Sequence, residues 1–260
     1  MVGSVAVLAI FAPLVAPYPG DAGFVCHLEE ALQPPSGEHL LGTDDMGRDL
    51  LSRILFGTRI TLQVGVVSIL LSTLIGVVLG MAAAYIGGVV DEIIMRTADL
   101  FMCVPYLVLG MALAVALKPG LTNLIIVVVA VFWPSTARMM RAEVLRVREE
   151  EYIISCQALG ISLFRTMFRH ITPNAITPVV VQSAIQAGWA ILLAATLGFI
   201  GVGVQPPMPE WGLILGTARR FLAVAWWYST FPGLAIVITV VGLNLTGDWL
   251  RNRYDPFLRN

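Results

Sequence analysis

Long uncharged hydrophobic stretches alternate with short charged ones along the whole chain. Six stretches contain no Asp, Glu, Lys or Arg: 1–20, 60–90, 100–117, 119–137, 171–209 and 221–247. A helix of about 18 or more such residues is long enough to cross a bilayer. The pattern therefore predicts an all-α, polytopic membrane protein with about six transmembrane helices. Their predicted cores are Val2–Pro17, Thr61–Tyr85, Leu100–Leu117, Leu121–Ala137, Ile176–Val204 and Thr230–Gly247.

The first stretch is shorter than the others. About 16 residues precede Tyr18, which is roughly 24 Å of helix against a hydrocarbon core of about 30 Å. No Lys or Arg precedes it, whereas a signal peptide begins with a positively charged region. We interpret 1–20 as a first transmembrane helix whose start is truncated or misassigned, with a signal sequence as the alternative.

The remaining chain is predicted to form three further parts. These are an extracytoplasmic loop over 21–59, a core domain with five transmembrane helices over 60–250, and a cytoplasmic tail over 251–260. Within the loop, Leu50, Leu51, Ile54 and Leu55 share one apolar face. Asp49 and Arg53 have the i, i+4 spacing of a helical ion pair. These features predict an interfacial helix on the outer surface.

Composition and charge agree with a membrane protein. The chain is 57% hydrophobic and 13% charged, against roughly 25% charge in soluble domains. A net charge of -1 gives no indication of nucleic-acid binding. Placing both termini in the cytoplasm leaves ten arginines inside and six basic residues outside, as the positive-inside rule favours. The three cysteines have no paired spacing, and His27 beside Cys26 lacks a third ligand, so no metal site is predicted.

A polar segment, Glu151–Asn174, separates two of the uncharged stretches. Arg138–Leu159 can continue the fourth transmembrane helix into the cytoplasm, and Gly160 is a suitable stop because glycine tolerates the left-handed conformation. Ser162 can cap a second helix, Leu163–His170.

This second helix is amphipathic and short. Leu163, Phe164, Met167 and Phe168 share one face, and Arg165 and Arg169 lie on another. Eight residues make about 12 Å of helix, too short to cross a membrane, and Pro173 is expected to end it. The pattern favours a helix that docks on a soluble partner. The alternative is a helix that lies flat in the lipid headgroups.

Three segments resemble one family. Glu151–Asn174 resembles the EAA loop of ABC-importer permeases of the dipeptide, oligopeptide and nickel group. The matching residues are Glu151, Tyr152, Ala158, Leu159, Gly160, Ser162, Arg165, Arg169, His170, Ile171, Pro173 and Asn174. Ser155, Cys156, Gln157 and Thr172 depart from the family pattern. Leu41–Leu62 is similar to the stretch before the second span of these permeases, and Leu197–Trp211 to the end of the fifth span and its exit loop.

The resemblance implies a transmembrane permease subunit that is not itself catalytic. Its expected partners are a second permease, two ATPase subunits, an extracytoplasmic solute-binding protein and the bilayer, with ATP and Mg on the ATPases and no cofactor on this chain. The residues implied to couple to the ATPases are Glu151, Ser155, Cys156, Ala158, Leu159, Gly160, Ser162, Leu163, Phe164, Arg165, Phe168 and Arg169. The sequence independently indicates that this chain does not hydrolyse ATP through a Walker A loop. Its single lysine, Lys118, lies between Leu117 and Pro119 and not in such a loop.

Two other classes of protein fit the sequence less well. An ion-coupled secondary transporter needs ionisable groups within its spans for proton coupling, and the uncharged stretches have none, although sodium coupling stays open. A membrane enzyme is disfavoured because the chain has no HExxH or GxSxG pattern. The cargo is left open among peptides, nickel chelates, opines and glutathione. Gly76 and Gly80 have GxxxG spacing and predict a close helix contact, within the subunit or with a partner permease.

Overall fold

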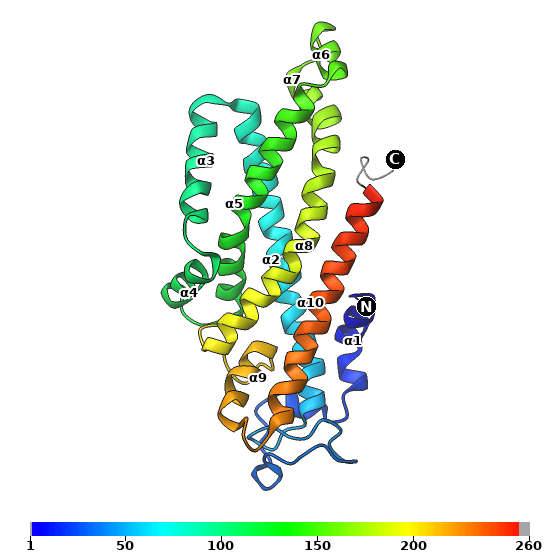
Figure 1. Cartoon of the computed structure of the whole chain (residues 1–260), viewed down its shortest axis with the longest axis vertical. Coiled ribbons are helices and arrows are strands. Elements are labelled where there is room, and N and C mark those ends of the chain that lie inside the picture. Colours follow the sequence, from blue (N-terminus) through cyan, green and yellow to red (C-terminus); the bar gives the residue numbers. More distant parts are fainter. Residues whose placement is uncertain (1, 255–260) are drawn as a thin grey trace. The chain divides into compact units, whose positions relative to one another are not determined.

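The computed structural model describes residues 2–254, whose regular elements are helices with no β-strand, which confirms the predicted all-α class. The α-helices are α1 (Val2–Val15), α2 (Leu50–Ile86), α3 (Gly88–Met102), α4 (Tyr106–Leu117), α5 (Leu121–Arg148), α6 (Glu151–Ala158), α7 (Leu163–Thr166), α8 (Thr172–Ile200), α9 (Trp211–Ala218) and α10 (Trp226–Tyr254) (Figure 1). Short 3-10 turns occupy Pro19–Ala22, Leu28–Glu30 and Arg219–Phe221, and a π-helical turn occupies Met167–Ile171.

Four described helices are long and apolar enough to cross a membrane. They are Leu50–Ile86, Leu121–Arg148, Phe164–Ile200 and Trp226–Arg253. They contain the second, fourth and sixth predicted spans, and they cover the fifth, Ile176–Val204, as far as Ile200. Helix α1 has 14 residues, about 21 Å at 1.5 Å per residue, and is shorter than a typical hydrocarbon core.

The third predicted span, Leu100–Leu117, differs from a single straight helix. Helices α3 and α4 are bent by 94° at the break between Met102 and Tyr106. Pro105 lies in this break. It has no amide hydrogen, and its ring disfavours the helical conformation at Val104.

The chain forms two compact units. Unit 1 contains the described parts of Met1–Ser68, Gly110–Val128 and Ala187–Asn244. Unit 2 contains those of Ile69–Leu109, Val129–Gln186 and Leu245–Asn260. In unit 1, the loop between α1 and α2 lies beside α9 and the start of α10 (Figure 1).

The predicted interfacial helix is instead the first part of α2. Leu50 and Ile54 are buried in the core of unit 1 together with Trp211 and Trp227. The predicted Asp49–Arg53 pair is also wrong. The Arg53 Nε lies 3.2 Å from Asp44 Oδ2. Asp49 Oδ2 instead accepts the amide of Ser52 in the first turn of α2, where a carboxylate is stabilised by the free amides of the helix.

Buried ion pairs fold the outer loop of unit 1. Asp44 accepts hydrogen bonds from the Met46 and Arg48 amides at 2.8 and 2.9 Å, and the Arg48 Nε lies 2.8 Å from Asp44 Oδ2. Asp44, Arg48 and Arg53 are all buried. Because a buried charge is costly without a partner, these residues depend on one another, and losing one leaves the others exposed to that cost.

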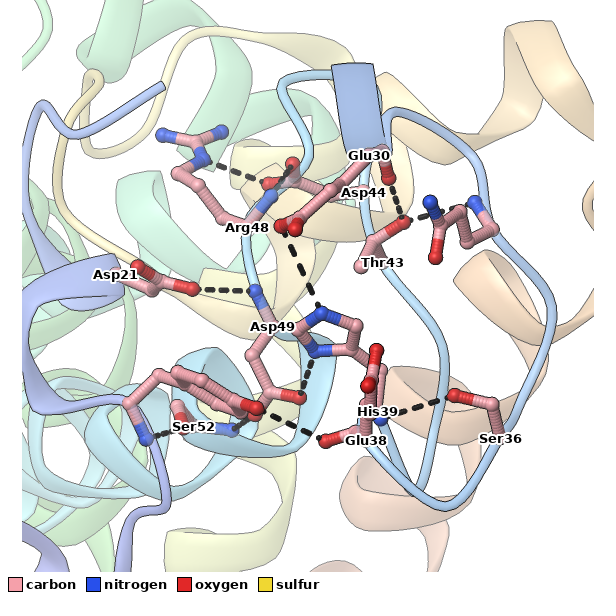
Figure 2. A network of polar contacts seen from close by, with 12 residues as sticks. Asp21, Glu30, Ser36, Glu38, His39, Thr43, Asp44, Arg48, Asp49 and Ser52 are labelled. Atoms are coloured by element: carbon pink, nitrogen blue, oxygen red, sulfur yellow. Dashed lines mark hydrogen bonds and ion pairs between the residues drawn. The ribbon is translucent and has the colours of Figure 1, made fainter. Parts of the chain in front are cut away.

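A second part of this network centres on His39 (Figure 2). Its Nδ1 lies 3.0 Å from Asp49 Oδ1, and its Nε2 lies 3.7 Å from Glu30 Oε2. Asp21 Oδ2 accepts the Asp49 amide at 2.7 Å. His39 is therefore a buried structural residue of the loop.

The loop is also fastened to α10. The Tyr228 hydroxyl donates to Asp45 Oδ1 at 2.8 Å, and the Trp227 indole Nε1 donates to the Thr43 carbonyl at 3.3 Å. These bonds join positions 183 and 184 residues apart in the sequence. They complete the core of unit 1 at this end of α10.

In unit 2, α2 packs closely on α5 through two glycines. A side chain at Gly76 would lie 2.6 Å from the Thr136 Cβ, and one at Gly80 would lie 2.4 Å from the Ala137 carbonyl oxygen. The predicted close contact of Gly76 and Gly80 is thus confirmed, and it lies within the subunit.

Candidate docking segment

The α6–α7 segment lies beyond the ends of α5 and α8 in unit 2 (Figure 1). The prediction of one helix over Arg138–Leu159 is only partly right, because α5 ends at Arg148 and α6 begins at Glu151. The Glu149 and Glu150 amides donate to carbonyls three residues back, at 3.2 Å each. Such i to i−3 bonds tighten the last turn and end the helix.

Gly160 ends α6 as predicted. Its φ is +75°, in the left-handed region, and the Ile161 amide donates to the Cys156 carbonyl at 3.1 Å. This is the six-residue closure of a Schellman motif, which satisfies a free carbonyl at the helix end. No atom lies within 4 Å of a Cβ placed on Gly160. Glycine is therefore required here by backbone conformation and not by lack of space.

The second helix joins the next span directly. Helix α7 begins at Leu163, directly after Ser162, and passes through the π-helical turn Met167–Ile171 into α8. The expectation that Pro173 ends this helix is wrong. The Thr172 amide donates to the Met167 carbonyl, five residues back, and this wider turn leads into the first turn of α8, where proline is tolerated. A displacement of α7 therefore passes into α8 without an intervening loop.

The apolar face of this helix is divided. Phe164 and Phe168 are 66% and 52% exposed, with their ring centroids 4.5 Å apart. Met167 is only 4% exposed and packs with Ile153 and Ile171 in the core of unit 2. The predicted shared face is thus wrong for Met167, which anchors the segment while the two phenylalanines remain exposed.

The structure places the other predicted coupling residues on the same segment. Glu151, Ser155, Ala158, Leu159, Ser162, Arg165 and Arg169 are exposed, and Cys156 is half-buried. The side chain of Leu163 lies outside the described side chains. The surface of the segment therefore combines exposed aromatic rings with two arginines, a composition enriched where proteins bind one another.

Two contacts that the sequence did not single out hold the segment on unit 2. Ile153 is fully buried beside Met167. The Asn174 Nδ2 donates to the Tyr152 hydroxyl at 3.2 Å and to the His170 carbonyl at 2.6 Å, which ties the base of α6 to α8. Tyr152 and Asn174 belong to the family pattern, but only their spatial proximity reveals this bond.

Ion pairs attach α3 to α5 in the same unit. The Arg141 guanidinium donates from Nε and NH2 to the two carboxylate oxygens of Asp91, both at 2.5 Å. Arg138 pairs with Asp99. Such a bidentate pair fixes orientation as well as distance, so α3 is held to the helix that leads into the docking segment.

The exit loop of unit 1 contains a buried carboxylate. Glu210 caps α9, and its two carboxylate oxygens accept the Gly212 and Leu213 amides at 2.9 and 2.8 Å. Burial raises the pKa of Glu210 to about 6, and the two amide hydrogen bonds oppose that rise. Trp211, next in sequence, donates from its indole Nε1 to the Ile54 carbonyl of α2 at 3.0 Å.

Residues 2–254 contain no group of three or more His, Cys, Asp or Glu side chains placed to hold a metal ion. His27 Nε2 lies 3.6 Å from Asp21 Oδ1.

Comparison with known proteins decides the family. Residues 76–260 match the family model of the binding-protein-dependent transport system inner membrane component. The chain belongs to this family. It is thus a permease subunit and a multi-pass membrane protein, and its resemblance to ABC-importer permeases is confirmed.

Similar permeases come from several bacteria. The chain is 40% identical over 260 residues to the dipeptide transport system permease protein DppC of Alkalihalophilus pseudofirmus, covering 100% of this chain and 84% of that protein. It is 41% identical over 249 residues to the probable D,D-dipeptide transport system permease protein DdpC of Escherichia coli, covering 96% and 83%. The glutathione transport system permease protein GsiD of Pectobacterium atrosepticum is 39% identical over 253 residues, with 97% and 83% covered.

A solved structure shares the permease fold. A chain of the inward-facing MetNI methionine ABC transporter superposes with a TM-score of 0.63 at 19% identity, covering 78% of this chain and 96% of that one. At this identity the similarity concerns the fold alone.

Proposed function

We propose that this permease subunit forms half of the translocation pathway of an ATP-driven importer of di- or oligopeptides or a related small solute, and that the α6–α7 segment docks its ATPase subunits. The observation that carries the proposal is the exposed pair Phe164 and Phe168 beside two exposed arginines, on a segment continuous with α8. A pair of exposed aromatic rings in water is unfavourable unless a partner covers it. Because α8 is itself a membrane span, movement of that partner displaces the span directly.

The cargo class is proposed from the relatives. Similar permeases are named for dipeptide, D,D-dipeptide and glutathione transport. These solutes share peptide or peptide-like amide bonds. A peptide-type cargo is therefore the simplest proposal for this chain.

The assembly follows from the same family. It contains a second permease, two ATPase subunits that bind ATP and Mg, and an extracytoplasmic solute-binding protein, while this chain itself catalyses no reaction and binds no cofactor. Both termini lie in the cytoplasm in this arrangement, which puts α6–α7 on the ATPase side of the membrane. The excess of arginines in the segments assigned to the cytoplasm supports this orientation.

Purification from the native membrane in mild detergent tests the assembly. Mass spectrometry is expected to find a second permease and ATPase subunits with Walker motifs alongside this chain. Recovery of this chain alone or only as a homo-oligomer would contradict the proposal and favour an ion-coupled carrier.

Gly160→Arg tests the docking segment. The substitution adds a bulky, charged side chain and forces a left-handed conformation that costs about 1–2 kcal/mol. We expect loss of co-purified ATPase and of uptake, with normal insertion of the chain.

Gly87→Arg is the matched control. Gly87 has a φ of +68° and open space where a Cβ would lie, like Gly160, but it is located between α2 and α3. Its ψ of −163° lies in a region that is essentially restricted to glycine, so the control carries a backbone cost at least as large as that at Gly160 without altering the docking segment. If both variants retain the ATPases equally, the α6–α7 segment is not the docking site and lies instead in the headgroups.

A further inference from the structure

The polar side chains in the middle of α8 fall into two groups. Ser183 and Gln186 are buried in unit 2. The Ser183 hydroxyl accepts from Thr73 and donates to the Val179 carbonyl, both at 2.8 Å. The Gln186 Nε2 donates to Ser135 at 2.9 Å, and its Oε1 accepts from Thr136 at 3.3 Å. These groups have the partners that a buried polar side chain requires.

Gln182 is the exception. It is exposed, and within the described residues its carboxamide has no hydrogen-bond partner. It also lies within the predicted Ile176–Val204 span, six residues after its start, which is about 9 Å along the helix. A carboxamide at this depth without a partner is unfavourable in hydrocarbon, so polar residues within spans face a bundle interior or water.

The opposite side of α8 has a different character. Val180 lies two positions from Gln182, about 200° around the helix, and is 49% exposed. Helix α8 thus exposes an apolar surface on one side and a carboxamide on the other. The apolar surface suits lipid or another apolar helix, and the carboxamide suits an aqueous path.

We propose that Gln182 lines the translocation pathway and hydrogen-bonds the backbone of a peptide cargo. A carboxamide both donates and accepts hydrogen bonds, as a peptide group does. It carries no charge, so it can recognise the backbone of peptides whose side chains differ. Residues 171–209 contain no charged side chain, so this stretch offers only neutral recognition. The inference rests on the proposed function and adds a cargo contact to it.

Thiol labelling tests the position of Gln182. The assembled transporter is prepared with Cys26 and Cys103 replaced by serine, and Gln182→Cys is introduced in that background. Labelling of the retained Cys156 is measured in the same background without Gln182→Cys and subtracted. Val180→Cys is the matched control on the opposite surface. We expect a membrane-impermeant methanethiosulfonate to react with the Gln182→Cys transporter and not with the Val180→Cys transporter. The dipeptide Ala-Ala, supplied with the binding protein, is expected to slow the reaction several-fold.

Transport kinetics test the hydrogen bond itself. Gln182→Leu is expected to raise the KM for Ala-Ala uptake about 3- to 10-fold, the effect of losing one neutral hydrogen bond. Gln182→Asn keeps the carboxamide and is expected to retain part of the affinity. ATPase and second permease should co-purify with both variants as with the unmodified chain.

Several outcomes would overturn the inference. An unreactive Gln182→Cys transporter with normal uptake would place the residue in lipid or packed protein. Loss of the second permease from Gln182→Leu would place it at a subunit interface. Labelling that Ala-Ala does not slow would contradict the cargo contact. Failure of the unmodified complex to take up peptides would instead count against the proposed cargo class, and thiol labelling alone would still test the aqueous position.

Discussion

Replacing Gly80 with valine should force α2 away from α5. A Cβ at Gly80 would lie 2.4 Å from the Ala137 carbonyl oxygen, 2.8 Å from the Met140 Cβ and 3.1 Å from the Arg141 amide nitrogen. Ordinary contact begins at about 3.5 Å, so the helices must separate by about 1 Å. Two of the three obstructing atoms belong to the α5 backbone, and no change of rotamer removes them. Overpacking of this kind costs typically about 1–3 kcal/mol.

Gly233→Val is the matched control. Gly233 lies in the long helix α10, where no atom is found within 4 Å of an added Cβ. An unobstructed substitution usually changes stability by no more than about 0.5 kcal/mol. The control therefore measures the effect of a helical valine without the clash.

The difference in Tm between the two variants is measured by heating the purified chain in detergent, with size-exclusion chromatography as the readout of unfolding. A cost of 1–3 kcal/mol corresponds to a fall in Tm of roughly 2–12 °C at about 2–4 °C per kcal/mol for a chain of this size. The Gly233→Val chain should unfold near the unmodified Tm. Equal Tm values for the two variants would refute the close α2–α5 packing.

Other substitutions test the remaining contacts. The raised pKa of Glu210 means that the folded chain binds the proton more tightly than the unfolded chain, so this group favours folding below pH 4.5 and loses that contribution as the pH rises through 6. Relative to Glu210→Gln, the unmodified chain should gain about 2 kcal/mol between pH 7 and pH 4, and a difference in Tm that does not change with pH would contradict this. Tyr228→Phe removes the 2.8 Å hydrogen bond to Asp45 and should lower the free energy of unfolding by about 1.5–3 kcal/mol, which is measured as a fall in Tm. An unchanged Tm would show that the bond does not form. Met167→Ala should lower stability by about 2–5 kcal/mol, whereas Phe168→Ala should leave Tm nearly unchanged and weaken ATPase recovery, and the reverse result would contradict the division of the helix face.

Features set by local chemistry were predictable from the sequence. Gly160 ends α6 in the left-handed region, and Lys118-Pro119-Gly120 forms a turn in which Lys118 has a φ of +69°. The length of the uncharged stretches identified the long spans, because a helix needs about 18 or more such residues to cross a bilayer. Both kinds of signal lie within a few adjacent residues or in composition.

Features set by geometry across several residues were not predictable in this way. Pro105 is a local signal for a helix break in the third predicted span, but one residue does not specify the 94° angle between α3 and α4. Pro173 continues a helix because a π-helical turn precedes it. The pairing of Asp44 with Arg48 and Arg53, in place of Asp49 with Arg53, depends on how the whole loop folds. Local spacing offered only Asp49 for Arg53, four residues away, because Asp44 is nine residues away.

The bonds from Tyr228 to Asp45 and from Trp227 to Thr43 set an order on biosynthesis. The loop is synthesised first, but its partners on α10 follow 183 and 184 residues later. At about 5–20 residues per second the ribosome needs roughly 10–40 s for that distance. Throughout this interval the nascent loop lacks the contacts that complete its core. The outer end of unit 1 therefore matures only after the final helix has been inserted, and a chain stalled before Trp226 would present an unfinished loop to the proteases of its compartment.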